Sequence, residues 1–171
     1  MLNPIRVAVL TSSDRAAAGI YVDKSGPALQ TLVRRTLPAQ VVATKILPDD
    51  RAKIAAQLRA WADGGEIDLI LITGGTGFTP SDVTPEATRE VLEKESPGLA
   101  EAMRAASLRI TPHAMLSRAV CGIRGLTLIV NLPGSPKAAC ENLQVIIPAL
   151  PHAIALLRGD PPGAGGHAHT A

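Results

Sequence analysis

The stretch Asp68-Leu69-Ile70-Leu71-Ile72-Thr73-Gly74-Gly75-Thr76-Gly77 decides the fold of this 171-residue chain. A strand is predicted over residues 68–73, and the continuous apolar run Leu69-Ile70-Leu71-Ile72 within it is typical of a strand buried on both faces. Such strands belong to parallel sheets that helices cover on both sides. The glycines that follow are typical of a sharp exit from a buried strand.

Strand and helix patterns alternate on either side of this run. Strands are predicted over residues 7–10 and 41–47, with a hairpin of two short strands over 119–123 and 126–131. Helices are predicted from Pro27 to Leu37 and over residues 99–108, 137–147 and 151–158. Another is predicted after Asp50, with Ile54, Leu58 and Trp61 on one face. A further helix is predicted to begin at Thr84, which would act as a cap before Pro85.

This alternation predicts one domain over residues 1–160. Its fold class is a three-layer α/β/α sandwich with a mostly parallel central sheet and a small β-hairpin. Residues 161–171 are rich in Gly, Pro and His. We interpret them as a disordered tail rather than as a weak metal site at His167 and His169.

The composition excludes several classes of protein. Hydrophobic residues make up 46% and charged residues 19%, which indicates a folded domain rather than a disordered chain. Aromatic residues make up 2%, and the 17 basic and 15 acidic residues are scattered, so no nucleic-acid surface is expected. The apolar stretch 145–157 is too short to span a membrane.

Two further features indicate a cytoplasmic protein. The N-terminus lacks the pattern of a signal peptide. Cys121 and Cys140 have no metal-binding spacing, and we expect free thiols, although a single disulfide between them stays open.

Ligands of open α/β sheets bind beyond the carboxyl ends of the strands. Four Gly- and Pro-rich segments are predicted at that edge: residues 11–26, 48–50, 74–84 and 131–136. Glycines in Gly74-Gly75-Thr76-Gly77 would let backbone N–H groups approach a phosphate, but a sharp strand exit explains them equally well. Pro80 stands where a dinucleotide fingerprint needs its third glycine, and no Walker A or Gly-x-Ser-x-Gly pattern is present.

Carboxylates at two of these strand exits suit a magnesium ion held against phosphates. They belong to Asp49 and Asp82, and the alternative is that Asp49 or Asp50 caps a helix and Asp82 shapes a turn. Asp14 and Asp23 in the first segment face the same choice. Arg118 and Arg124 suit either an anionic ligand or a solvated surface.

The block Thr73–Thr88 closely resembles the signature of the MogA/MoaB family of molybdopterin adenylyltransferases, which includes the G domains of the plant molybdenum insertase and of gephyrin. Four further blocks agree with this family: residues 11–15, 23–27, 115–118 with 122–125, and 131–137. The resemblance runs from about Ile5 to Asp160. Ser81 departs from it, because a basic residue is usual there.

The resemblance implies Mg²⁺-dependent transfer of AMP from ATP to the terminal phosphate of molybdopterin, with release of pyrophosphate. It implies that Asp49 and Asp82 are catalytic and hold Mg²⁺, and that Gly74, Gly75, Thr76 and Gly77 form the nucleotide phosphate loop. Substrate or nucleotide contacts are implied for Ser13, Asp23, Ser107 and Ser117, and a loop on the pterin side for Pro133 and Gly134. A homotrimer and a downstream molybdenum insertase are implied as partners.

Two other functions fit the same residues. One is a non-catalytic molybdopterin carrier or scaffold on this fold, since a fold does not determine activity. The other is a nucleotide hydrolase, which would turn over ATP without any pterin.

Overall fold

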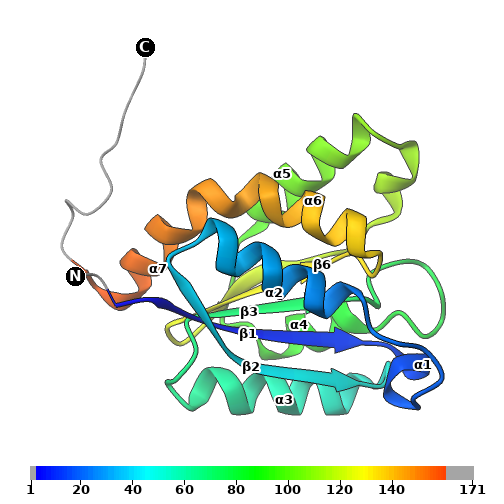
Figure 1. Ribbon diagram of the computed structural model, residues 1–171, viewed down its shortest axis with the longest axis horizontal. Coiled ribbons are helices and arrows are strands. Elements are labelled where there is room, and N and C mark those ends of the chain that lie inside the picture. Colours follow the sequence, from blue (N-terminus) through cyan, green and yellow to red (C-terminus); the bar gives the residue numbers. More distant parts are fainter. Residues whose placement is uncertain (1–2, 161–171) are drawn as a thin grey trace.

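A six-stranded sheet of order β2-β1-β3-β6-β5-β4 forms the centre of the computed structural model, which describes residues 3–160 (Figure 1). The strands are β1 (Ile5–Ser12), β2 (Ala39–Leu47), β3 (Leu69–Thr73), β4 (Lys94–Glu95), β5 (Cys121–Arg124) and β6 (Thr127–Leu132). β1, β2, β3 and β6 run parallel, and β5 runs antiparallel to β4 and β6. The predicted fold class is confirmed, while the predicted tail 161–171 lies outside the described residues.

Helices cover both faces of this sheet. They are α1 (Asp14–Ala17), α2 (Ser25–Thr36), α3 (Arg51–Asp63), α4 (Thr84–Val91), α5 (Pro97–Leu108), α6 (Pro136–Ile146) and α7 (Leu150–Arg158), with 3₁₀ turns η1 (Pro112–Leu116) and η2 (Ile147–Ala149). Alternate residues of β3 supply the two apolar layers. Leu69 and Leu71 pack with α2, α5, α6 and α7, and Ile70 and Ile72 pack with α3 and α4.

Four short elements are additional to the predicted pattern, namely α1, β4, η1 and η2. Each is five residues or shorter, so it carries too little apolar periodicity to be recognised in the sequence. The predicted cap of α4 is wrong: Val83 is the N-cap and Thr84 is already helical. The predicted hairpin is confirmed, with Gly125 at φ +55° in its turn.

The helical run Pro136–Arg158 is 23 residues long and passes a test of length and composition for a membrane span. Core helices of folded domains pass the same test. Its residues Leu143, Ile146, Leu150 and Ile154 belong to the apolar core beneath the sheet, so we assign this run to the core. Both cysteines are free thiols, and burial raises the pKa of Cys121 to about 12.

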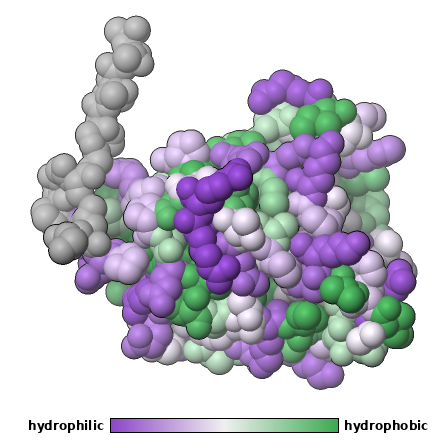
Figure 2. Space-filling view, in the orientation of Figure 1, coloured by the Kyte–Doolittle hydropathy of each residue, from purple (hydrophilic) through white to green (hydrophobic). Residues whose placement is uncertain are grey.

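Hydrophobic side chains are also exposed at one end of the molecule. Figure 2 shows them at the right of the face, over α1 and the segment that follows it. Ile20 and Val22 in that segment are 71% and 77% exposed. Val22 shares a surface cavity with Thr44 and Ile46 of the edge strand β2, which pairs with β1 alone.

A buried carboxylate ties the two ends of the described chain together. Asp68, immediately before β3, accepts hydrogen bonds from Arg6 Nη2 at 2.9 Å and from Arg158 Nη2 at 2.7 Å. Arg158 also donates to the carbonyl oxygens of Asn3 and Pro4. Burial by itself would raise the pKa of Asp68, but the hydrogen bonds from the two arginines outweigh it and hold this pKa well below its usual value.

We expect Asp68→Asn to lower the free energy of unfolding by about 3 kcal/mol at pH 7, because two arginines lose their shared carboxylate. Since the pKa of Asp68 is lower in the folded than in the unfolded chain, this stabilisation is fully present above the ordinary Asp pKa and decreases progressively as the pH falls from about 4 towards the much lower folded-state pKa. Urea denaturation at pH 7 and pH 3 should therefore show a gap between wild type and variant that shrinks at pH 3. Asp63→Asn, at the exposed pair with Arg124, is the control and should leave the free energy of unfolding nearly unchanged, because solvent screens an exposed ion pair. Equal effects of the two substitutions would contradict this prediction.

Candidate functional site

The four predicted loop segments meet at one edge of the sheet. Ser12 pairs with Leu47, Thr11 pairs with Thr73, and Thr73 pairs with Leu132, so the four parallel strands end at the same level. The arrowheads of β1 and β2 point to this edge, at the right of Figure 1. The sequence-based expectation that these loops gather is therefore confirmed in the structure.

The glycine loop (residues 74–77) follows β3 and packs closely against its neighbours. Gly74 has φ +100° and Gly75 has φ +64°, both in the region that favours glycine. A Cβ on Gly74 would lie 2.3 Å from the carbonyl oxygen of Ser12, and one on Gly75 would lie 2.5 Å from Thr84 Oγ1. Glycine is thus required at these two positions by conformation and by space.

Three successive backbone N–H groups of the glycine loop have no acceptor within the described chain. The N–H of Gly74 donates to the carbonyl oxygen of Leu132 at 3.2 Å, whereas those of Gly75, Thr76 and Gly77 take part in no hydrogen bond among residues 3–160. Successive free N–H groups in a turn form a concave site for an anion. The loop can therefore bind phosphate oxygens.

Asp49 lies on one side of this loop. Its Oδ1 accepts a hydrogen bond from Ser12 Oγ at 2.5 Å and would lie 3.4 Å from a Cβ on Gly75. Its Oδ2 accepts from the N–H of Asp14, and Asp14 Oδ1 accepts from the N–H of Asp49 in return. The neighbouring Asp50 caps α3 through the N–H of Lys53 at 3.0 Å, so the helix cap does not occupy Asp49.

Asp82 lies on the other side, next to Gly77. Its Oδ2 would be 3.0 Å from a Cβ on Gly77 and accepts hydrogen bonds from the N–H and the hydroxyl of Thr79, each at 2.8 Å. Asp82 therefore shapes a turn through one carboxylate oxygen. Its Oδ1 has no hydrogen-bond partner among the residues the structure describes.

A polar cavity of about 200 Å³ opens on the Asp49 side of the loop. The predicted site residues Ser13, Asp23, Asp49, Gly74, Gly75 and Gly134 line it. Ser13 also caps α1, and Asp23 accepts hydrogen bonds from Thr11 Oγ1 and from the N–H groups of Ser25 and Gly26 at the start of α2. Both oxygens of Asp23 therefore hold the protein's own backbone and side chains in place.

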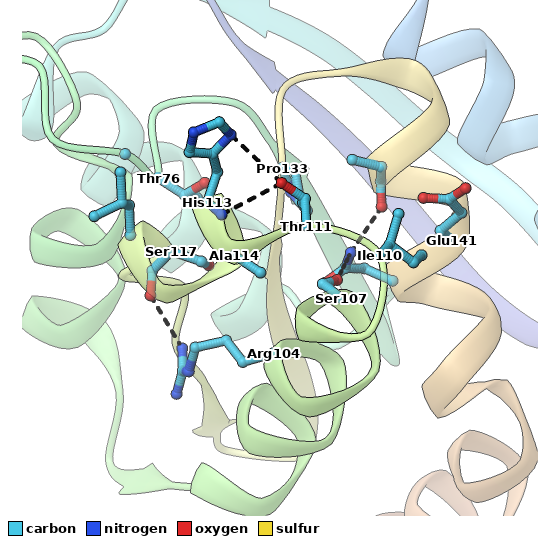
Figure 3. A pocket seen from close by; sticks show the side chains of 14 residues that line it. Thr76, Arg104, Ser107, Ile110, Thr111, His113, Ala114, Ser117, Pro133 and Glu141 are labelled. Carbon is cyan, nitrogen blue, oxygen red and sulfur yellow. Dashed lines mark hydrogen bonds between the residues drawn. The ribbon is translucent and has the colours of Figure 1, made fainter.

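A larger and more apolar cavity of about 270 Å³ lies on the other side of the loop (Figure 3). The predicted site residues Thr76, Gly77, Ser107, Ser117 and Pro133 line it. The glycine loop thus contributes its first half to one cavity and its second half to the other. Asp82 lines neither cavity and borders the loop between them.

The larger cavity is also lined by polar residues that the sequence did not single out, Asn142 and His113 among them. Asn142 on α6 donates from Nδ2 to Ser107 Oγ at 3.0 Å. His113 on η1 stands at the wall of the cavity, with Nδ1 3.4 Å from Thr111 Oγ1 (Figure 3). Asn142 could have been found in the sequence as a polar residue on the apolar face of a predicted helix. His113 could not, because η1 has no recognisable sequence pattern.

Two predicted cations have structural partners. Arg124 donates to both carboxylate oxygens of Asp63 at 2.8 Å, at the opposite edge of the sheet from the loops. Arg118 contacts the carbonyl oxygens of Gly77 and Asp82 and the carboxylate of Glu86. Neither arginine is a simple solvated surface residue.

No cluster of three or more His, Cys, Asp or Glu side chains suited to a metal ion occurs within residues 3–160. Magnesium is usually bound by one or two carboxylates together with phosphates of the substrate. Asp49 beside Gly75 and Asp82 beside Gly77, next to the free N–H groups of the loop, fit that donor set.

Comparisons with known proteins agree on one family. Residues 8–152 match the model of a probable molybdopterin binding domain. The chain is 42% identical over 161 residues to the molybdopterin adenylyltransferase of Helicobacter pylori, covering 93% of this chain and 91% of that protein. It is 50% identical, with a TM-score of 0.86, to the solved molybdopterin biosynthesis enzyme MoaB of Thermus thermophilus, covering 92% and 98%.

Longer relatives contain the same region as one part. Gephyrin of Dictyostelium discoideum is 46% identical over 164 residues, which cover 91% of this chain. The chain spans about a quarter of the length of such relatives, 23% of this gephyrin and 26% of the Drosophila melanogaster protein cinnamon. The matched residues 8–152 include all four loops at the sheet edge.

Proposed function

The chain belongs to the molybdopterin-binding domain family of molybdenum cofactor biosynthesis, and on this premise we propose that it transfers AMP from ATP to the terminal phosphate of molybdopterin. The observation that carries the proposal is the glycine loop, with three free N–H groups, a carboxylate beside Gly75 and another beside Gly77, and a cavity lined by each half of the loop. A loop shared by two cavities brings two phosphate-bearing substrates to one place.

The two cavities differ in the ligand they suit. The smaller cavity combines the glycines with Ser12, Ser13 and Asp49, so its polar wall suits a triphosphate. The larger cavity has an apolar wall with the Ser107–Asn142 pair, which suits a flat heterocycle such as a pterin. AMP transfer across the loop therefore needs no movement of either substrate between sites.

The reaction needs positioning more than proton transfer. An anionic phosphate oxygen of molybdopterin attacks the α-phosphorus of ATP, one P–O bond forms, the bond to the β-phosphate oxygen breaks, and pyrophosphate leaves. The nucleophile is already deprotonated, so no general base is required. The backbone N–H groups of the glycine loop hold phosphate oxygens in line for this displacement.

Asp49 and Asp82 would hold Mg²⁺ together with the triphosphate. The ion supplies positive charge that stabilises the leaving pyrophosphate. The buried hydroxyl of Thr84, which has no partner among residues 3–160, and the free N–H groups of the glycine loop support a ligand at this position.

The test is an anaerobic incubation of the purified chain with molybdopterin, ATP and Mg²⁺. The proposal predicts adenylylated molybdopterin and pyrophosphate in equal amounts, and almost no ATP turnover without pterin. Pterin binding without any adenylylated product would instead support a carrier or scaffold, a second candidate kept because the solved relatives include proteins named MoaB. ATP turnover in the absence of pterin would support the hydrolase.

We also propose a cytoplasmic homotrimer that passes its product to a molybdenum insertase. The exposed apolar side chains Ile20, Val22, Ile110 and Met115 support an oligomer, since such side chains favour burial between subunits. Light scattering of the purified chain would measure the number of subunits. A solved relative named as a tungsten cofactor synthesizing protein, MoaB of Pyrococcus furiosus, leaves the eventual metal open to molybdenum or tungsten.

Thr84→Val is expected to weaken ATP binding about tenfold without lowering the thermal stability. The Thr84 side chain is fully buried, and its hydroxyl has no partner among residues 3–160, so the free protein loses no hydrogen bond. A nucleotide at Gly75 would gain that hydroxyl as a donor. Calorimetric titration with ATP and a melting curve measure the two effects.

The matched control is Thr127→Val, also buried, whose hydroxyl donates to the carbonyl oxygen of Ile67 at 2.7 Å at the far edge of the sheet. This control should lose about 1 kcal/mol of stability and keep its affinity for ATP. A loss of stability in Thr84→Val with unchanged ATP affinity would show that the hydroxyl is merely structural.

A further inference from the structure

The outer part of the glycine loop is attached to the rest of the protein in an unusual way. Residues 77–82 fold back on themselves through Thr79 and Asp82, and Phe78 at their tip is 68% exposed. Within the described chain, every hydrogen bond that joins residues 77–82 to the remainder of the protein is donated by Arg118. These residues therefore depend on one side chain for their position.

Arg118 contacts both ends of this segment. Its Nε donates to the carbonyl oxygen of Gly77 at 2.7 Å and its Nη2 donates to the carbonyl oxygen of Asp82 at 2.7 Å. Its backbone N–H donates to the carbonyl oxygen of Thr76 at 3.0 Å. A planar guanidinium can reach two such carbonyls at once, whereas the single ammonium of lysine cannot do so with the same geometry.

The guanidinium is itself held in place. Its Nη1 pairs with Glu86 Oε1 on the first turn of α4, and the Arg118 side chain is 32% exposed. Burial would raise the pKa of Glu86, but the hydrogen bond from Arg118 outweighs it and lowers that pKa, so the carboxylate stays charged at neutral pH. Arg118 also follows Ser117 directly, at the wall of the larger cavity.

We propose that Arg118 is a positioning residue for AMP transfer, which holds Gly77 and Asp82 so that the loop N–H groups and the Asp82 carboxylate face the nucleotide. This inference rests on the proposed function. Arg118 acts through the loop and not on the substrate, because its three donor nitrogens are directed to protein oxygens. Its loss should lower the rate of the chemical step more than it weakens ATP binding.

The first measurement tests the position of the loop and does not depend on the reaction. Chymotrypsin cleaves after aromatic residues, so the fragments cut after Phe78, identified by mass and distinct from those cut after Tyr21 or Trp61, report the local opening of residues 77–82. We expect Arg118→Ala to increase the rate of this cleavage about tenfold. Arg124→Ala is the control. It also removes an arginine that makes two side-chain hydrogen bonds, six residues further along the chain, but at the opposite end of the strands from the loop.

The second measurement is steady-state AMP transfer. We expect kcat of Arg118→Ala to fall about 100-fold, the effect of a misplacement of about 1 Å, with KM for ATP changed only a few-fold. Guanidinium ion in the assay should restore part of the rate, and Arg118→Lys should restore little. Arg124→Ala should keep the wild-type kcat.

Unchanged cleavage after Phe78 in Arg118→Ala, or an equal loss of kcat in Arg118→Ala and Arg124→Ala, would overturn the inference. If the wild-type protein transfers no AMP, the proposed function is wrong. In that case the cleavage comparison decides by itself whether Arg118 positions the loop.

Discussion

Asp82→Asn and Asp49→Asn are each expected to lower the rate of AMP transfer by roughly 10²–10³-fold, about 3–4 kcal/mol of barrier. Asparagine at residue 82 keeps the oxygen acceptor for Thr79, and asparagine at residue 49 keeps one for Ser12 while it loses the bond from the N–H of Asp14, so most loop contacts are retained. It removes the negative charge that would hold Mg²⁺ against the triphosphate. Single-turnover kinetics with saturating ATP and pterin measure the effect.

Asp50→Asn is the matched control, one residue from Asp49 and with the same chemical change. Its side chain caps α3 through the N–H of Lys53, a bond that asparagine can also accept. The control should therefore transfer AMP at the wild-type rate. Full AMP transfer by Asp82→Asn would show that this carboxylate has no catalytic role. If the Asp82→Asn variant restores growth of a strain that lacks the natural protein, the scaffold function is favoured.

Gly74→Ala is expected to remove AMP transfer and to lower the free energy of unfolding by about 3 kcal/mol or more. The added Cβ would lie 2.3 Å from the carbonyl oxygen of Ser12, which is part of β1 and cannot move aside, and φ is +100°. The loop must shift to relieve this contact, and its N–H groups then leave their positions. Denaturation by urea and titration with ATP measure the two consequences.

Gly65→Ala separates conformation from crowding. Gly65 has φ +73°, but an added Cβ there would meet nothing within 4 Å. The Gly65→Ala variant should lose about 1 kcal/mol of unfolding free energy, which is the usual cost of a left-handed φ for alanine relative to glycine. It should keep full AMP transfer activity. Equal losses of stability in the two variants would show that the contact with Ser12 is relieved without cost.

The parallel sheet and the meeting of the loops were predictable because they follow from local patterns. A continuous apolar strand at residues 69–73 requires cover on both faces, and the strands that share its direction must end at one edge. The structure confirms both expectations. The short elements α1 and η1 lacked any such pattern. The position of His113, which lies on η1, was therefore not predictable either.

Which of Asp49 and Asp50 caps α3 is decided by which side chain accepts the hydrogen bond from the N–H of Lys53. Both residues stand at the right place in the sequence, and both have the side chain of a helix cap. The structure gives the cap to Asp50, which leaves Asp49 beside Gly75. At the start of α4 the residue type was misleading. Thr84 before Pro85 is typical of a helix cap, yet Val83 is the N-cap and the Thr84 hydroxyl is buried without a partner among the described residues.

The sequence by itself determined the α/β class, the loops that gather at one edge and the family, because these depend on residue types at fixed spacing along the chain. Tertiary structure alone decided that the glycine loop separates two cavities, that Asn142 reaches Ser107, and that Arg118 holds residues 77–82 in place. Each of these contacts joins residues 35 or more positions apart. No local pattern records which of many distant partners a side chain meets, since packing of the whole core sets that distance.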